Sequence, residues 1–354
     1  MKHTYEVNLT QEQEARVKRL HQKSFIFDAL TTSILDVEYA KKLRSVGINA
    51  TNYTVASTDL FNGKVIQDNF VSTCKKIGHW IRVLEKCHEF ASLTTNLEEM
   101  HKIVDSGKIA IFFGFQNGSP IEDNLDYLDI FYRLGVRFIQ LTYNARNYIG
   151  NGCGEANDSG LSSFGEKVIT RMNELGIVVD LSHCGYQTTM DAIKCSKKPA
   201  LITHANVKAL ADTPRNKTDE QISAMAERGG VIGVKHMLGD TKTKLAQDTT
   251  VADLVDHIDY IVQLVGIDHV AIGTDFTGTT DRSVLERANK NVELIRSQFS
   301  GPYVGKRFKP AGIASISGLP NITRALVLRG YTDTDIKKIL GENWLRVLKD
   351  IFNH

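Results

Sequence analysis

The stretch VVDLSHCG, residues 178–185, decides how this sequence is interpreted, because a run of strand-forming residues stops there at a histidine. Its first residues are β-branched or apolar and fit a buried strand. His183 follows at the point where that strand would end. The stretch ALITHAN (200–206) repeats the arrangement and runs into His204. Two imidazoles at strand ends raise the question of whether they share one site.

Short apolar runs of this kind recur along the chain and alternate with amphipathic segments. Most are continuous rather than alternating, as in strands that are buried on both faces of a parallel sheet. Eight runs are predicted as strands: 24–28, 47–52, 109–115, 137–142, 177–182, 200–203, 231–235 and 269–274. Segments between them have the apolar spacing of helices: 124–134, 164–175 and 250–266. The alternation predicts an α/β fold, a (β/α)8 TIM barrel, with a doubly wound parallel sheet as the alternative.

The domain organisation is predicted to be simple. The chain has neither a low-complexity segment nor a Pro/Gly-rich linker, so residues 1–354 are expected to form one barrel domain. Residues 1–22 should form an N-terminal helix. Residues 319–354 should form C-terminal helices that pack on the barrel.

Composition limits the classes of partner. Charged residues make up 24% of the chain and the net charge is +2, with basic residues scattered, so a nucleic-acid partner is not expected. No apolar run approaches eighteen residues, and the N-terminus lacks a signal-peptide pattern, so no membrane contact is expected. The five cysteines are an odd number without CxxC spacing, which is typical of a reducing compartment. These features together predict a cytoplasmic protein.

The strand ends suggest a metal site. In a (β/α)8 barrel the carboxyl ends of the strands surround one mouth, where catalysis takes place. His183 would end the fifth strand, His204 the sixth, and Asp275, in HVAIGTDFTG (269–278), the eighth. Two neutral imidazoles and a carboxylate are a plausible ligand set for zinc or a similar divalent ion. A single histidine at a strand end is more often structural, so the residues alone leave both interpretations open.

Longer motifs resemble the renal (membrane) dipeptidase family of the amidohydrolase superfamily. They follow one another over about residues 105–350: DSGLSSFGEKVITRMNELGIVVDLSH, THANVKALADTPRN, AMAERGGVIGV, VGIDHVAIGTDF and ILGENWLRVL. The resemblance implies a (β/α)8 barrel that hydrolyses dipeptides, including those with a D-residue, at a two-metal site. It also suggests a possible homodimer, since the family is often dimeric.

The resemblance assigns roles by position. His183 and His204 match the two histidines of the family's second metal, and Asp275 matches the carboxylate that handles the proton. Arg215 matches an arginine that holds the substrate carboxylate, a role that suits the guanidinium fork. Three polar residues near the same mouth are further predicted substrate contacts: Asn117, Tyr143 and Asn144.

The departures from the family concern its first metal. Leu30 and Thr32 stand where the family has a His-x-Asp pair, and neither is a normal metal ligand. Gln116 replaces the bridging glutamate, and a neutral amide cannot bridge two cations as a carboxylate does. Tyr143 replaces a further histidine. We therefore expect at most one divalent ion, zinc, held by the two remaining histidines and the Gln116 carbonyl.

These observations predict a hydrolase. It would act on an amide or related C–N bond of a small carboxylate-bearing substrate, a dipeptide or a modified amino acid, with Asp275 as the base. The alternatives are a non-hydrolytic or lyase-type enzyme on the same barrel, and a catalytically silent homologue that binds a small molecule. The joint presence of both histidines, Asp275 and Arg215 argues against the silent homologue.

Overall fold

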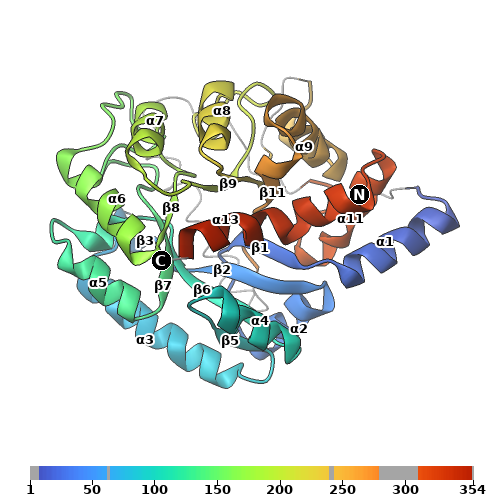
Figure 1. Cartoon of the computed structure of the whole chain (residues 1–354), viewed down its shortest axis with the longest axis horizontal. Helices are drawn as coiled ribbons and strands as arrows, with labels where there is room; N and C mark the ends of the chain where they lie inside the picture. Colours follow the sequence, from blue (N-terminus) through green and yellow to red (C-terminus); the bar gives the residue numbers. More distant parts are fainter. Residues whose placement is uncertain (1–7, 62–63, 239–242, 279–309, 353–354) are drawn as a thin grey trace.

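A closed barrel of eight parallel strands forms the centre of the protein (Figure 1). The structure is a computed structural model that describes residues 8–61, 64–238, 243–278 and 310–352. The barrel strands are β1 (Ile26–Thr31), β2 (Ile48–Ala56), β6 (Ile109–Phe115), β7 (Val136–Gln140), β8 (Val178–Asp180), β9 (Ile202–Ala205), β10 (Ile232–Val234) and β11 (Val270–Ile272). Each of the eight predicted runs overlaps one of these strands.

Closure of the sheet separates the two predicted folds. One ladder runs β1–β2–β6–β7–β8 and a second runs β9–β10–β11. Parallel bridges join Asp180 to Leu201 and Thr31 to Phe276, so the ladders meet at both ends. A doubly wound sheet would stay open, so the (β/α)8 barrel is confirmed. The short strands β3 (Thr58–Phe61) and β4 (Lys64–Gln67), an antiparallel hairpin, and β5 (Ala91–Leu93), which pairs with β6, were not predicted.

Helices surround the barrel. They are α1 (Gln11–Lys23), α2 (Val37–Ser45), α3 (Phe70–Lys86), α4 (Leu97–Asp105), α5 (Asp126–Arg133), α6 (Ser163–Leu175), α7 (Tyr186–Cys195), α8 (Asp219–Glu227), α9 (Val251–Val265), α11 (Pro320–Leu328), α12 (Asp333–Lys337) and α13 (Asn343–Phe352). Thr250 caps the start of α9 through a capping box and Gly266 ends it. The tail is not one continuous helix, because a π-helical turn at Lys338–Glu342 separates α12 from α13.

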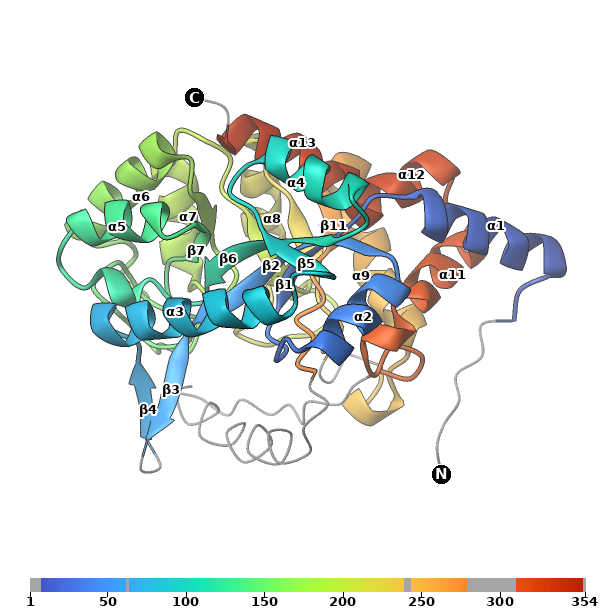
Figure 2. The same cartoon turned by 90° about the horizontal axis from the view of Figure 1, so that it is seen from below.

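The core has two layers, which follow from the alternation of side chains along each strand. Ile232 and Val234 of β10 pack outward against the helices, whereas the preceding Val231 packs inside the barrel. Helix α13 adds Trp344 and Ile351 to the inner layer. It lies at the end of the barrel away from the β3–β4 hairpin (Figure 2). The carboxyl ends of the strands are therefore left open for a site at the other end.

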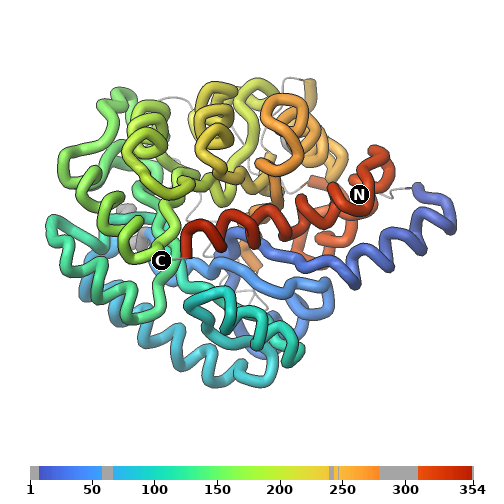
Figure 3. The backbone as a smooth tube through the Cα atoms, in the orientation of Figure 1, coloured from blue at the N-terminus to red at the C-terminus, as the bar shows by residue number. Residues whose placement is uncertain are grey.

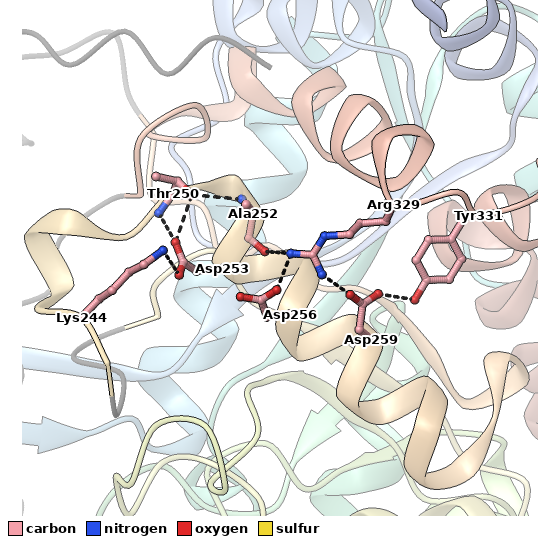
Figure 4. Close-up of polar contacts among 8 residues, drawn as sticks. All are labelled: Lys244, Thr250, Ala252, Asp253, Asp256, Asp259, Arg329 and Tyr331. Carbon is pink, nitrogen blue, oxygen red and sulfur yellow. Dashed lines mark hydrogen bonds and ion pairs between the residues drawn. The ribbon is translucent and has the colours of Figure 1, made fainter. Parts of the chain in front are cut away.

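Helix α1 packs against α11 of the C-terminal segment. The tube in Figure 3 shows α1 beside the C-terminal helices, and His21 Nδ1 lies 2.9 Å from Thr323 Oγ1. A second set of polar contacts joins the C-terminal segment to α9 (Figure 4). There Arg329 pairs with Asp256 and Asp259, and Tyr331 donates to Asp259 at 2.6 Å. None of the helices within the described ranges is long and apolar enough to cross a lipid bilayer.

Candidate active site

The two predicted histidines come together at the barrel mouth. His183 follows β8, and His204 lies in the neighbouring β9. Their Nε2 atoms are 3.1 Å apart, and both side chains are buried. The Tyr143 ring stacks on His183, with 4.3 Å between ring centroids and 19° between planes. The predicted site residues of strands four, five and six therefore form one cluster.

A β-bulge in β9 explains the position of His204. Ile202 pairs with Ile232 and Ala205 pairs with Val234, so two residues of β9 oppose the single Gly233 of β10. Such a bulge re-aims a side chain, and bulges are frequent next to active sites. The bulged Thr203 carbonyl occupies the space above two glycines. A Cβ on Gly233 would lie 2.1 Å from Thr203 O, and one on Gly273 would lie 1.7 Å from it.

A buried hydrogen-bond network sets the tautomer of His204. The Asp180 carboxylate accepts from the Ser182 hydroxyl at 2.5 Å and from the Thr203 hydroxyl at 2.6 Å. Because the single hydroxyl proton of Thr203 goes to Asp180, its oxygen must accept from His204 Nδ1, 2.8 Å away. His204 therefore carries its proton on Nδ1 and a lone pair on Nε2.

His183 has the same tautomer for a different reason. Its Nδ1 lies 2.7 Å from Asn144 Oδ1, which can only accept, so Nδ1 carries the proton. The Cys153 thiol points to the same oxygen from 3.7 Å. The Nε2 lone pairs of His183 and His204 therefore face each other. Two facing lone pairs repel unless a cation, either a proton or a metal ion, lies with them.

The histidine pair fits one metal ion. Two nitrogens in a tetrahedral zinc site with bonds of about 2.0–2.1 Å lie about 3.3 Å apart. The observed Nε2 separation of 3.1 Å is close to that value. Partners that orient both Nδ1 atoms are also typical of metal-binding histidines. Within the part of the chain that the structure describes, no group of three His, Cys, Asp or Glu side chains is placed to hold a metal. The two imidazoles thus provide only part of a ligand set.

Asp275 lies at the end of β11 in a left-handed backbone conformation, with φ of 57°. Its amide donates to Leu30 O at 3.0 Å. The preceding Thr274 donates from its amide to Asp28 at 2.7 Å and from its hydroxyl at 2.5 Å. Asp28 of β1 thereby holds the turn that presents Asp275. Burial raises the pKa of Asp28 to about 7, the Thr274 contacts lower it, and the nearby Asp275 charge raises it.

Arg215 is placed differently from a simple carboxylate receptor. It is buried, and its Nη1 donates to Ser182 O while its Nη2 donates to His204 O at 2.6 Å. The guanidinium thus joins the ends of β8 and β9, the two strands that lead to the histidines. Each Nη atom donates one of its two N–H groups to these carbonyls, so three of the five N–H groups of the guanidinium remain for other acceptors. Its substrate contact stays a prediction.

Gln116 and Asn117 follow β6 and are also buried. The Gln116 amide donates to Thr54 Oγ1 at 3.0 Å, which leaves its Oε1 as the atom that could bind a metal. Asn117 Oδ1 accepts from the Ser119 amide at 3.1 Å and from the Asn147 amide group at 2.9 Å. These contacts close the loop after β6. The predicted roles of Gln116 as a ligand and Asn117 as a substrate contact stay predictions.

A cleft of about 1060 Å³ lies beside the mouth, between the N-terminal ends of α3 and α6. Its lining includes Arg146, Tyr148 and Phe164. The predicted site residues are absent from this lining. We therefore place the chemistry at the histidine pair and not in the cleft.

Sequence reasoning missed the residues that orient the imidazoles. Asp180, Ser182 and Thr203 are buried and hold His204 in one tautomer. The available signal was a hydroxyl residue directly before each histidine, in LSH and ITH. Lys235, which sequence reasoning did not assign to the site, is 6% exposed and directly follows β10.

Comparison with known proteins identifies the family of this chain. The sequence profile of the membrane dipeptidase family (peptidase family M19) matches residues 13–297 and 298–353. The chain belongs to this family. An amidohydrolase from Pseudomonas aeruginosa has a crystal structure similar to this one, with a TM-score of 0.84, 32% identity, and coverage of 96% of this chain and 99% of that one. The predicted resemblance is thereby confirmed.

More distant family members share the fold or part of the sequence. Dipeptidase tcpJ from Claviceps purpurea is 26% identical over 293 residues, which are 82% of this chain and 62% of that protein. The uncharacterized dipeptidase C965.12 from Schizosaccharomyces pombe is 30% identical over 69% of this chain and 54% of its own length. The chain therefore aligns with somewhat over half of these two dipeptidases. A metallo peptidase from Rhodobacter sphaeroides, solved with a phosphinate mimic of L-Ala-D-Ala, shares the fold at 18% identity and a TM-score of 0.76.

Proposed function

We propose that this family member hydrolyses an amide or related C–N bond of a small carboxylate-bearing substrate, with one divalent ion. The observation that carries the proposal is the pair of Nε2 lone pairs of His183 and His204, 3.1 Å apart at the barrel mouth. A divalent ion held there would polarise the substrate carbonyl and lower the pKa of water at the same place. Zinc suits a site built of neutral imidazoles.

The surrounding residues have distinct tasks in this proposal. Asp275 takes a proton from the attacking water and returns it to the leaving nitrogen, so a C–O bond forms as the C–N bond breaks. The products are a carboxylic acid and an amine. Tyr143 fixes the plane of the His183 ring by stacking, and Asn144 holds its tautomer. Leu30 and Thr32 offer no second ligand pair, so simple L,L-dipeptides should be poor substrates.

Elemental analysis after dialysis against zinc tests this proposal. The wild-type protein should bind at most one zinc per chain. His183→Asn and His204→Asn should abolish binding, and Asn144→Leu should weaken it about 10–100-fold because it removes the orienting acceptor. His21→Asn is the matched control, since His21 belongs to α1 and contacts Val46 and Thr323 rather than the histidine pair, so the change should not affect zinc binding.

Turnover is measured separately, as amine released from N-acyl amino acids and dipeptides with and without a chelator. Chelator-sensitive release from an N-acyl amino acid or a modified dipeptide would support the proposal. Two zinc ions per chain, or rapid chelator-sensitive turnover of an ordinary L,L-dipeptide, would contradict it. If the protein binds no metal, a proton shared by the two imidazoles would explain their close approach. That result would favour the catalytically silent homologue that binds a small molecule.

A further inference from the structure

Lys235 occupies a central position at the mouth. It directly follows β10, the strand that lies between β9 and β11 in the barrel. His204 lies in β9, and Asp275 follows β11. The carboxyl ends of neighbouring parallel strands meet at one mouth. Lys235 therefore lies between the histidine pair and the proposed base, and its side chain is almost completely buried.

The alternation along β10 directs Lys235 inward. Val231 packs in the inner layer, and Ile232 and Val234 pack in the outer one. Successive side chains of a strand point to opposite faces, so the side chain after Val234 returns to the inside. The Lys235 amide donates to Asn206 Oδ1 at 3.1 Å, which ties the end of β10 to the end of β9.

Lys235 is one of three buried cations in this region. Burial raises the pKa of the Cys153 thiol, and the charges of Arg215, Lys217 and Lys235 oppose that rise. Arg215 donates through both Nη atoms to main-chain carbonyls, and Lys217 donates to Cys184 O at 2.9 Å and Thr189 Oγ1 at 3.2 Å. Arg215 and Lys217 therefore hold loops and strand ends together. A positive field in a buried mouth attracts an anionic ligand.

We propose that Lys235 binds the carboxylate of the substrate, and that Arg215 is a positioning residue for the two histidines. This inference rests on the proposed function for its substrate class, a small amide that bears a carboxylate. An ammonium group has three donors, so a substrate oxygen can share it with a protein group. In Arg215, by contrast, both Nη atoms already donate to main-chain carbonyls at the ends of β8 and β9, so its guanidinium is held as a link between these two strands.

Binding of two small probes tests the inference without any need for turnover. N-acetylglycine and N-acetylglycinamide differ in the carboxylate, and their dissociation constants can be measured by NMR titration at millimolar concentrations. The wild type should bind the acid about tenfold or more tightly than the amide. Lys235→Met should remove that preference, and Lys235→Arg should restore most of it. Lys235→Gln serves as a second neutral variant if Lys235→Met does not fold.

Zinc binding gives an independent measurement for the positioning role. Lys235→Met should leave zinc affinity unchanged, whereas Arg215→Met should lower it about tenfold or more, because both strand ends lose their shared donor. The inference is overturned if the wild type does not prefer the acid, or if Arg215→Met alone removes the preference. The proposed function is judged by chelator-sensitive turnover, so the failure of one can be told from the failure of the other.

Discussion

Asp275 has a left-handed backbone conformation and is also the proposed base. The substitution Asp275→Asn tests the second property without changing the first. Asn adopts φ near the observed 57° as readily as Asp does, so Asp275→Asn should keep the turn. Turnover should fall about 10²–10⁴-fold because the proton acceptor is gone, while probe binding and thermal stability stay unchanged. Steady-state kinetics and NMR titration measure the two effects. Near-normal turnover would make Asp275 a structural residue.

Asp28 should make the free energy of unfolding depend on pH, and Asp28→Asn should remove this dependence. Burial raises its pKa from 3.8 to about 7, so between these values the folded state holds a proton that the unfolded chain has released. Stability due to this group therefore falls as pH rises from about 4 to about 7, by a few kcal/mol at most. Asp28→Asn should gain on the wild type over that interval, in urea unfolding at pH 4, 5.5 and 7. A constant difference across pH would show that Asp28 does not titrate there.

At the scale of the element, the β9 bulge depends on two glycines, Gly233 in β10 and Gly273 directly after β11. Gly233→Ala would place its Cβ 2.1 Å from Thr203 O, a main-chain atom that cannot rotate away. We expect a loss of at least about 2 kcal/mol in the free energy of unfolding. Zinc affinity should fall as well, since the bulge aims His204.

A glycine in an ordinary helix gives the control for this element. Gly78 lies in α3, and a Cβ there would have Arg82 Nη1 as its nearest atom, at 3.7 Å. Gly78→Ala should therefore stabilise the protein by up to about 1 kcal/mol and leave zinc binding unchanged. Urea unfolding and a zinc titration compare the two variants. Equal effects of the two substitutions would mean that the bulge does not require Gly233.

At the scale of the whole molecule, α13 closes the barrel through Trp344. Its ring is fully buried against Phe27, with 6.3 Å between ring centroids, and its indole donates to Ile272 O at 2.9 Å. Trp344→Ala should cost about 3–5 kcal/mol. Arg329→Ala, which removes the exposed ion pairs of Figure 4, should cost about 1 kcal/mol or less. Unfolding in urea ranks the two, and a larger cost for Arg329→Ala would contradict this account of the C-terminal helices.

The sequence by itself determined the eight strands, the class of fold and the two histidines. Continuous apolar runs, helical spacing and capping residues such as Thr250 act over a few neighbouring positions, so they can be read locally. The predicted barrel then implied that His183 and His204 meet at one mouth, because every parallel strand of a barrel ends there.

Only the tertiary structure decided how the site is held. Asp28 and Thr274 are 246 positions apart, and their contact depends on closure of the barrel. The bulge that aims His204, and the carbonyls that occupy Arg215, likewise depend on neighbours from other strands. A residue's hydrogen-bond partners and burial are set by such distant neighbours, whereas local pattern reports only periodicity. For this reason the sequence suggested a substrate contact for Arg215, whereas the structure shows its guanidinium hydrogen-bonded to the ends of two strands.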